Sequence, residues 1–216
     1  MRISDLSRQT GVPVGTIKFY LREGLLPPGR LTSRNQAQYD EKHLRRLWLI
    51  RAFTTIGQLD LSSVQVLLSA IADDQLPVPE LYGVVNRAMF PEDTAVGQDP
   101  SRDRSELAQA HSDVDGLLDD LGWRVPFGVP GRQTLAEVLA AMRRLGCGCG
   151  ADYFLAYGRA AEQLTDLPPA GAAVERAAVV ARTILIETAF AALRRMAQEH
   201  VVSTRLVPPL APDPAA

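Results

Sequence analysis

The sequence predicts a mostly α-helical protein, with a winged helix-turn-helix at its N-terminal end and an all-α region after it. Three observations predict this fold class. Apolar residues recur at helical spacing in nearly every segment between Gly and Pro breaks. The pattern typical of paired strands is confined to residues 25–39, around Pro27, Pro28 and Gly29. The 216 residues, 46% hydrophobic and 22% charged, have the composition of a soluble globular protein with one large domain or two small ones.

Two short helices joined by a tight turn are predicted first. Ser4 is expected to cap the first helix and Gly11 to end it, because Gly readily adopts the left-handed conformation of a C-terminal cap. Pro13 suits the first position of a second helix, which runs to about Arg22. Two short helices in this order form a helix-turn-helix, whose second helix can enter the major groove of DNA.

The second helix has two different faces. Val14, Ile17 and Leu21 recur at helical spacing and share an apolar face. The outward face therefore holds a cation, an aromatic ring and a second cation, namely Lys18, Phe19 and Arg22.

Residues 25–39 are predicted to form a basic β-wing beside these helices. The Pro-Pro-Gly run excludes a helix, and the two ends, residues 25–26 and 37–39, are expected to pair as a short hairpin. Arg30 and Arg34 lie within the wing and supply positive charge for DNA phosphates.

Two further helices are predicted before residue 73. Asp40 is expected to cap one that ends near Gly57. Ser62, with Gln65 three residues later, forms a capping box for another that runs over residues 63–72. The first of these helices carries an apolar stripe of Leu44, Leu47, Ile50 and Phe53.

The clearest domain boundary lies at residues 73–100. This segment contains four prolines and one stretch, Glu80–Phe90, that can hold a helix. Further helices are predicted near 102–121, 133–145, 151–165 and 171–205. The predicted domains are the winged helix-turn-helix at 1–72, a Pro-interrupted linker with a short helix at 73–100, an all-α domain at 101–207 and a disordered tail at 208–216.

The net charge of -2 conceals a strong asymmetry along the chain. Residues 1–56 carry ten basic and four acidic side chains, a net charge of +6, and the remaining residues carry 13 basic and 21 acidic ones, a net charge of -8. A basic module joined to an acidic one is expected when only the first faces a polyanion. The distribution therefore favours DNA as a partner of the N-terminal part.

Several short motifs near the N-terminus occur in the order and spacing of a known family. They are Ile3–Leu6, Thr10–Val12, Thr16–Tyr20, Arg22–Leu26 and Tyr39–Asp40. With them, residues 1–72 resemble the winged helix-turn-helix domain of MerR-type transcription regulators. The resemblance and the charge pattern together assign DNA binding to Thr16, Lys18, Phe19, Tyr20, Arg22, Arg30, Arg34, Asn35, Gln36, Tyr39, Arg45 and Arg46.

The chain departs from the family pattern at some of these positions. Lys18 stands where the recognition helix usually has Arg, and Leu21 replaces the usual acid. The wing, at residues 35–39, lacks the family's arginine, so Arg34 or Arg30 must supply the phosphate contact. Tyr20 is expected mainly to pack against the third helix. Arg45 and Arg46 are phosphate contacts or, alternatively, part of a solvated face.

The predicted helix at 171–205 is apolar nearly all round in its middle. Such a helix must be buried on most sides, and the same helix of a second copy is the simplest cover. We therefore expect the all-α domain at 101–207 to form a homodimer through Ile184, Ile186, Phe190 and Leu193. This domain also resembles, in composition and length alone, the C-terminal domain of TetR-type regulators.

Two candidate effector sites lie in the same domain. The first is a pocket for a small molecule, lined by aromatic side chains that could alternatively belong to the core. These residues are Trp123, Phe127, Tyr153, Phe154 and Tyr157. Cys147 and Cys149 invite a metal- or redox-sensing interpretation, but two thiolates supply only half of a tetrahedral zinc site. The glycines around them favour a turn between helices, and no cofactor is expected.

Together these features predict a sequence-specific DNA-binding transcription regulator that acts as a homodimer on a palindromic promoter site. The resemblance implies that the regulator distorts promoter DNA in response to a small-molecule effector. It would then affect RNA polymerase indirectly, through the promoter DNA. A metal- or redox-sensing regulator using Cys147 and Cys149 and an architectural DNA binder without effector are the alternatives.

Other classes of protein are not favoured by the sequence. An enzyme is not expected, because the three histidines are scattered and no Walker, Rossmann or G-x-S-x-G motif occurs. No membrane span or signal peptide is predicted. The expected location is the bacterial cytoplasm, in association with DNA.

Overall fold

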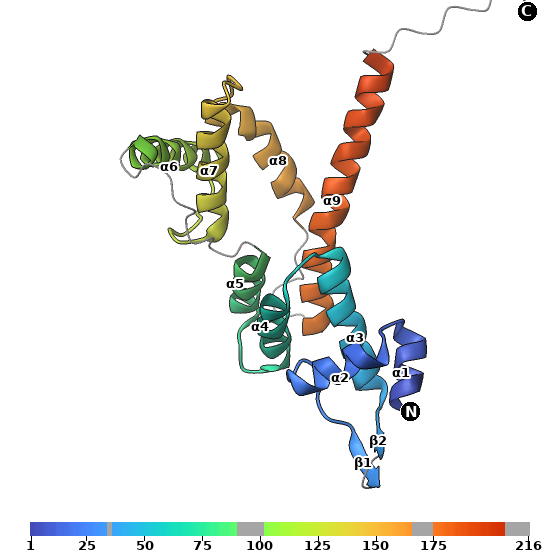
Figure 1. The fold of residues 1–216 in the computed structure, drawn as a ribbon. Coiled ribbons are helices and arrows are strands. Elements are labelled where there is room, and N and C mark those ends of the chain that lie inside the picture. Colours follow the sequence, from blue (N-terminus) through green and yellow to red (C-terminus); the bar gives the residue numbers. More distant parts are fainter. Residues whose placement is uncertain (34–35, 90–101, 166–174, 206–216) are drawn as a thin grey trace, which may run out of the picture. The chain divides into compact units, whose positions relative to one another are not determined.

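The chain divides into two compact units. The structure, a computed structural model, describes residues 1–33, 36–89, 102–165 and 175–205. The first unit joins residues 1–72 to residues 176–216, and the second consists of residues 73–175. Figure 1 shows the fold coloured along the chain. The second unit is therefore inserted, in the order of the sequence, between two parts of the first.

The first unit contains six helices or helical turns and a two-stranded hairpin among its described residues. They are α1 (Ile3–Thr10), α2 (Val14–Arg22), β1 (Arg30–Ser33), β2 (Gln36–Gln38), α3 (Glu41–Arg51), the π-helix η1 (Ala52–Ile56), α4 (Leu61–Ala72) and α9 (Arg176–Arg205). The hairpin extends from the base of the helical cluster (Figure 1). The predicted fold class, mostly α with an N-terminal winged helix-turn-helix, is confirmed.

The two ends of α1 differ in how well the sequence predicts them. Gly11 ends the helix with a φ of 69°, as expected for a left-handed C-terminal cap. The predicted N-cap, Ser4, is wrong, because the helix already begins at Ile3. The Asp5 carboxylate instead accepts a hydrogen bond from the backbone N–H of Arg2 at 2.8 Å.

The hairpin is shorter than predicted. β1 and β2 pair antiparallel, with Arg30 opposite Gln38. Residues 25–26 do not pair in it, because Leu25 and Leu26 are buried in the core of the first unit. The prolines at 27–28 have no N–H to donate, so the first strand starts only after them.

The caps of α3 and α4 are both aspartates. Asp40 caps α3 as predicted, and its carboxylate accepts hydrogen bonds from two backbone N–H groups of the first turn. The predicted cap of α4, Ser62, is wrong. The Asp60 carboxylate accepts from the backbone N–H of Ser63 at 2.8 Å and also from the Ser62 hydroxyl. An aspartate two residues earlier therefore takes the role that the Ser-x-x-Gln pattern suggested for the serine.

The core of the first unit is built around α3 and η1. The predicted apolar stripe is fully buried, and it consists of Leu44, Leu47, Ile50 and Phe53. The last of these residues lies in the π-helical turn, which the sequence did not predict. Gly57 ends this turn with an ordinary negative φ.

Helix α9 completes this core. Ile184 is 1% exposed, and a Cβ placed on Gly57 would lie only 2.7 Å from its Cγ2 atom, so a glycine is needed there. The Arg176 guanidinium donates to the carbonyls of Ala70 and Ile71 at the end of α4, at 2.7 and 3.3 Å. The predicted domains group this helix with residues 101–207, whereas in the structure it packs with the N-terminal domain. An apolar pattern shows that a helix is buried but not against which partner.

The second unit is all-α in its described residues. It consists of α5 (Val78–Met89), α6 (Arg102–Leu121), α7 (Pro130–Arg144), the 3-10 turn η2 (Ala151–Phe154) and α8 (Leu155–Leu164). Its core joins α6 to α7 through Ala110, Val114, Leu118, Ala136, Leu139 and Ala140. Among the described residues, three ion pairs connect the same helices, namely Arg132 with Asp115, Arg143 with Asp113 and Arg144 with Glu106.

A membrane-spanning helix is not found among the described residues, since none of their helices combines the necessary length and apolar character.

Candidate nucleic-acid interface

The outward face of α2 has the side chains that the sequence predicts. Lys18 and Arg22 are exposed, and Thr16 is half-buried. The Arg22 guanidinium lies 5.2 Å from the centre of the Phe19 ring and 2.9 Å from the Glu23 carboxylate. This cation–π contact holds Arg22 on the same surface as the Lys18 ammonium.

Tyr20 lies at the inner edge of this surface. Its ring centre is 5.9 Å from that of Phe19, and burial raises the pKa of the Tyr20 phenol. Its main-chain carbonyl accepts a hydrogen bond from the N–H of Leu26 at 3.1 Å. Tyr20 thus connects α2 to the segment that leads into the wing, and a DNA contact of its hydroxyl stays a prediction.

The wing presents polar and basic side chains. Arg30 and Gln36 are exposed, and Nη2 of Arg30 lies 3.4 Å from Oε1 of Gln38. Arg34 and Asn35, two of the predicted DNA contacts, lie outside the described residues.

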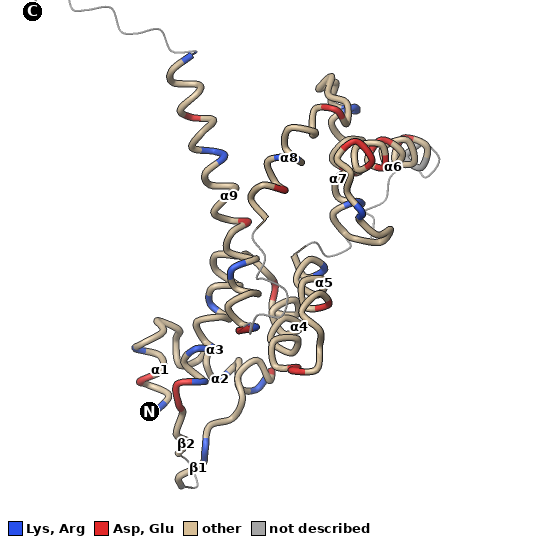
Figure 2. The backbone as a smooth tube through the Cα atoms, turned by 180° about the vertical axis from the view of Figure 1, so that it is seen from behind, with Lys and Arg blue, Asp and Glu red and all other residues tan. Residues whose placement is uncertain are grey.

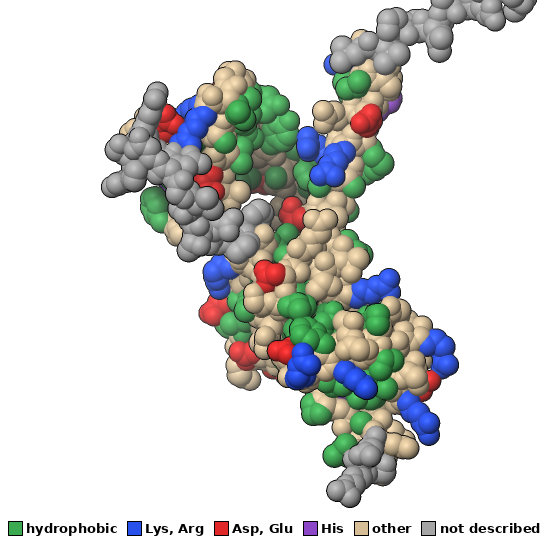
Figure 3. Space-filling model, in the orientation of Figure 1, with side chains coloured by type: hydrophobic (Ala, Val, Ile, Leu, Met, Phe, Trp, Pro, Cys, Tyr) green, Lys and Arg blue, Asp and Glu red, His purple; other side chains and the backbone are tan. Residues whose placement is uncertain are grey.

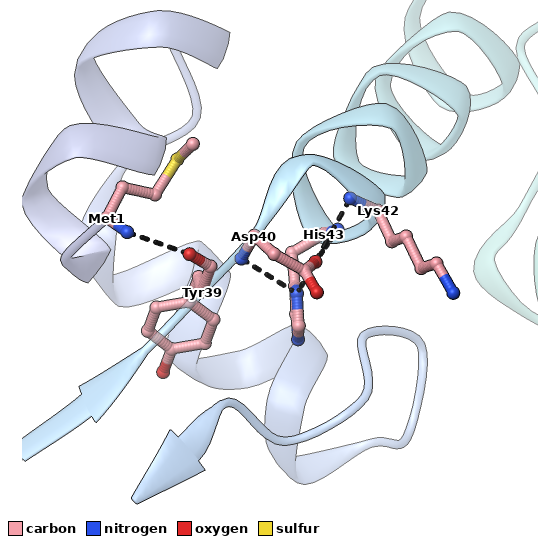
Figure 4. Close-up of polar contacts among 5 residues, drawn as sticks. All are labelled: Met1, Tyr39, Asp40, Lys42 and His43. Carbon is pink, nitrogen blue, oxygen red and sulfur yellow. Dashed lines mark hydrogen bonds and ion pairs between the residues drawn. The ribbon is translucent and has the colours of Figure 1, made fainter. Parts of the chain in front are cut away.

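Tyr39 anchors the base of the wing (Figure 4). Its ring, 8% exposed, packs edge-to-face on His43, with ring centres 5.2 Å apart. Nδ1 of His43 is 2.6 Å from the Asp40 carboxylate, and this hydrogen bond is the main cause that lowers the pKa of Asp40. The main chain of Tyr39 pairs with that of Met1 in both directions, at 2.8 and 2.9 Å. Tyr39, predicted as a DNA contact, therefore fixes the wing to α3 through its ring and to the residue before α1 through its main chain.

The three arginines of α3 have different environments. Arg45 is exposed, and its Nε is 3.7 Å from the Glu41 carboxylate. Arg46 is half-buried and donates from Nε to the carbonyl of Leu25 at 2.6 Å, and burial lowers the pKa of Arg46. Arg51 donates to the main chain at the end of α1. Of the two arginines predicted to contact phosphates, Arg45 is available, whereas Arg46 has an internal partner.

Positive charge collects in the first unit. This unit carries 15 basic and eight acidic residues, a net charge of +7, and the second carries eight basic and 17 acidic ones, a net charge of -9. Figure 2 shows acidic positions along α6, and Figure 3 shows basic side chains spread over the lower part of the first unit. The structural units separate the charges more sharply than a division at residue 56, because α9 adds further arginines to the basic unit.

A groove between α1, α2 and the wing was not predicted from the sequence. It has a volume of about 540 Å³. Its polar lining includes Arg2, Lys18, Thr32, Gln36 and Gln38. Arg2 contributes to the basic charge of the N-terminal part, but no local sequence pattern shows that it lies beside a hairpin about 30 residues later in the sequence.

The structure brings together three of the five aromatic residues predicted to line an effector pocket. The rings of Tyr153, Phe154 and Tyr157 have centres between 5.5 and 6.0 Å apart. Trp123 and Phe154 both pack against the core of the second unit. Phe127 is 85% exposed. The residues are therefore divided between core and surface, and an effector pocket stays a prediction.

The two cysteines lie in the turn that the glycines predict. Gly146 and Gly148 have φ values of 68° and 62°. Cys147 is exposed, and Sγ of Cys149 lies 3.2 Å from the Cys147 carbonyl oxygen. The described residues contain no group of three or more His, Cys, Asp or Glu placed to hold a metal ion.

The four residues predicted at the dimer interface have different environments. Ile184 belongs to the core of its own chain. Ile186, Phe190 and Leu193 are 50, 42 and 59% exposed, and Met196 prolongs the same apolar surface of α9. The available part of the predicted interface therefore begins after Ile184.

Comparisons with known proteins agree with this geometry. Residues 1–71 match the sequence profile described as MerR HTH family regulatory protein. The chain is 39% identical over 87 residues to an HTH-type transcriptional regulator, a ZntR homolog, from Haemophilus influenzae, covering 40% of this chain and 64% of that protein. It is 35% identical over 57 residues to the HTH-type transcriptional regulator CueR of Salmonella typhi, covering 26% of this chain and 41% of CueR. The chain thus spans less than two thirds of these relatives' length.

A solved structure matches far more of the chain. The crystal structure of SCO5550 from Streptomyces coelicolor A3(2) is similar with a TM-score of 0.66 and 32% sequence identity. The match covers 98% of this chain and 100% of that one. The similarity therefore includes both units and the long C-terminal helix.

Proposed function

Because residues 1–71 belong to the MerR family of helix-turn-helix regulatory proteins, we propose that the whole chain is a DNA-binding transcription regulator. One observation carries the proposal. Lys18 and Arg22 of α2 and Arg30 of the wing are exposed on a unit with a net charge of +7. A helix that enters a major groove needs such cations at its outward face, and phosphate contacts from a wing fix its orientation.

The regulator acts as a homodimer on a palindromic promoter site. The exposed part of α9 supports this, since Ile186, Phe190, Leu193 and Met196 form an apolar surface on a helix that leaves the core of its own unit. A second copy of the same helix would cover this surface at the lowest cost. Two copies related by twofold symmetry would then place two winged modules on two half-sites.

The dimer distorts promoter DNA in response to a small molecule that binds the second unit. The support is the order of the chain, because the acidic second unit is inserted between α4 and α9 of the first. A ligand that favours one geometry of such an insertion biases the dimer by the difference in its affinity for the two geometries. RNA polymerase then responds to the altered promoter DNA. The regulator therefore acts in the compartment that holds the chromosome. We assign no catalytic step to it.

Fluorescence anisotropy with DNA from upstream of its own gene tests the proposal. Wild-type protein should bind this fragment more tightly than a scrambled duplex at the same salt concentration. Lys18→Ala should weaken binding at least about tenfold, since charge-assisted contacts contribute roughly 1.5–3 kcal/mol each. Arg159→Ala is the matched control, because it also removes one exposed cation but lies on α8 of the second unit.

The outcomes separate the parts of the proposal. Equal affinity for both duplexes would contradict sequence-specific binding. An unchanged affinity of Lys18→Ala would remove α2 from the interface. Equal losses in Lys18→Ala and Arg159→Ala would reduce the effect to overall charge.

A further inference from the structure

We infer that the groove between α1, α2 and the wing seats one sugar-phosphate strand of DNA and that Arg2 binds a phosphate of that strand. The inference rests on the proposed function and adds to it a DNA-binding residue outside the recognition helix and the wing. Its basis is the position of the Arg2 guanidinium in a groove that is lined by both α2 and the wing.

The groove is formed by three elements that are distant in sequence. Lys18 comes from α2, Arg2 precedes α1, and Thr32, Gln36 and Gln38 come from the wing. Its volume of about 540 Å³ is large enough for a nucleotide backbone unit rather than for a single water molecule. Hydrogen-bond donors on both walls give it the chemistry of a phosphate seat.

The geometry of B-DNA explains why a backbone strand belongs there. When a recognition helix lies in the major groove, a wing beside it reaches toward the adjacent minor groove. One sugar-phosphate strand separates these two DNA grooves. That strand must therefore pass between α2 and the wing, which is where the protein groove lies.

Arg2 lies in this groove, and its guanidinium is free to bind the strand. Its backbone N–H is held by the Asp5 carboxylate at 2.8 Å, while its side chain is exposed. Among the described residues, no hydrogen bond or ion pair occupies the Arg2 guanidinium. An arginine in this state can bind a phosphate with two parallel hydrogen bonds.

The acidic residue in the groove does not cancel this charge. The Asp5 carboxylate pairs with Arg8 at 2.7 Å and accepts the Arg2 N–H. These contacts, the Arg2 hydrogen bond first, keep the pKa of Asp5 below its usual value. With Asp5 offset by Arg8, Arg2 and Lys18 leave the groove positively charged.

The test compares Arg2→Gln with the wild type in the full-length protein. Anisotropy with the upstream fragment, measured between 50 and 200 mM KCl, gives the affinity and its salt dependence. Arg2→Gln should lower the affinity about tenfold. It should also reduce the slope of log K against log salt by roughly 1 to 2, since each lost phosphate contact accounts for about 0.9 and a dimer loses two. Arg159→Gln, with the same charge change in the second unit, should alter neither quantity by that much.

A neutral phosphate identifies the contact itself. Methylphosphonate is placed at one backbone position at a time in each half-site. At the position that Arg2 contacts, the substitution should weaken wild-type binding but leave Arg2→Gln unchanged. Circular dichroism should show equal helix content in both proteins, because the Arg2 side chain does not cap α1.

Three results overturn the inference. In the first, wild-type protein binds the upstream fragment but Arg2→Gln behaves like Arg159→Gln. In the second, the effects of Arg2→Gln and of methylphosphonate add at every backbone position. Either result would show that Arg2 contacts no phosphate, while the proposed function would stand. If wild-type protein shows no preference for this DNA, the proposed function and the inference fail together.

Discussion

Replacing Ile184 with Ala should destabilise the first unit, whereas the same change at Ile186 should act mainly on the proposed dimer. The two isoleucines lie on the same helix, but Ile184 is 1% exposed and Ile186 is 50% exposed. In the structure, Ile184 contacts the η1 turn beside Gly57. The pair therefore separates the contribution of α9 to its own core from its contribution to a second copy.

The magnitude follows from the buried side chain. Ile→Ala removes three carbon atoms, each worth about 0.8 kcal/mol of transfer free energy when buried. The cavity left beside η1 raises the total to about 2–4 kcal/mol of unfolding free energy. At Ile186 the loss within one chain should stay below about 1 kcal/mol, since half of that side chain already contacts solvent.

The two tryptophans of the chain allow each unit to be observed separately. Trp123 belongs to the second unit, so Trp123→Phe leaves Trp48 of α3 as the fluorescence reporter of the first. Urea unfolding of Ile184→Ala in this background should show the loss, and the reciprocal background, Trp48→Phe, should show an unchanged second unit. Sedimentation should show that Ile186→Ala weakens self-association at least about tenfold.

Protein concentration is the control for this experiment, because dimer dissociation makes unfolding concentration-dependent. The urea midpoints of the variants are compared at the same protein concentration, and the comparison is repeated at several concentrations. If Ile184→Ala destabilises the first unit no more than Ile186→Ala does, α9 does not belong to the core of residues 1–72.

Three further predictions concern single contacts. Asp60→Ala should cost the first unit about 1 kcal/mol through the lost cap of α4, and Asp60→Asn should restore most of it in urea unfolding. Hydrogen bonds, the Ser62 hydroxyl first, lower the pKa of Asp60 to about 2 from its usual 3.8, so its ionised form adds stability above pH 4 that is lost as the pH falls toward 2. In Asp60→Asn this part of the acid dependence should be absent, and an unchanged acid profile would contradict the role of the carboxylate. Arg176→Ala should destabilise the first unit by about 1–3 kcal/mol, because two carbonyls at the end of α4 lose their donor, and an unchanged urea midpoint would argue against this contact. Gly158→Val should destabilise the second unit in the Trp123 signal, since a Cβ there would lie 2.5 Å from Cδ1 of Leu121, and an equal loss in the Trp48 signal would contradict two separate units.

Local features of the fold were predictable from the sequence. Gly11 and Asp40 act as caps because their preferences depend on a few neighbouring residues. The stripe that begins at Leu44 is buried because helical periodicity alone defines its face. Ser62 does not cap α4, because Asp60, two residues earlier, competes for the same backbone donors and carries a full charge.

Contacts between distant residues were not predictable. Arg46 donates to a carbonyl 21 residues away and Arg51 to one 41 residues away, yet both have the same local pattern as the exposed Arg45. The partner of α9 and the groove beside Arg2 depend on the same kind of long-range information. Composition could supply the basic charge of the N-terminal part, but only the fold shows which of its cations are exposed.

A hydroxyl-radical footprint on the DNA upstream of its own gene tests the proposed regulator most directly. Wild-type protein should protect two short stretches of backbone related by twofold symmetry, with centres about 10 base pairs or a multiple of that apart. Lys18→Ala should lose both stretches at the same concentration, while Arg159→Ala should keep them. Uniform or absent protection by a folded, dimeric wild-type protein would contradict sequence-specific binding by the winged helix-turn-helix.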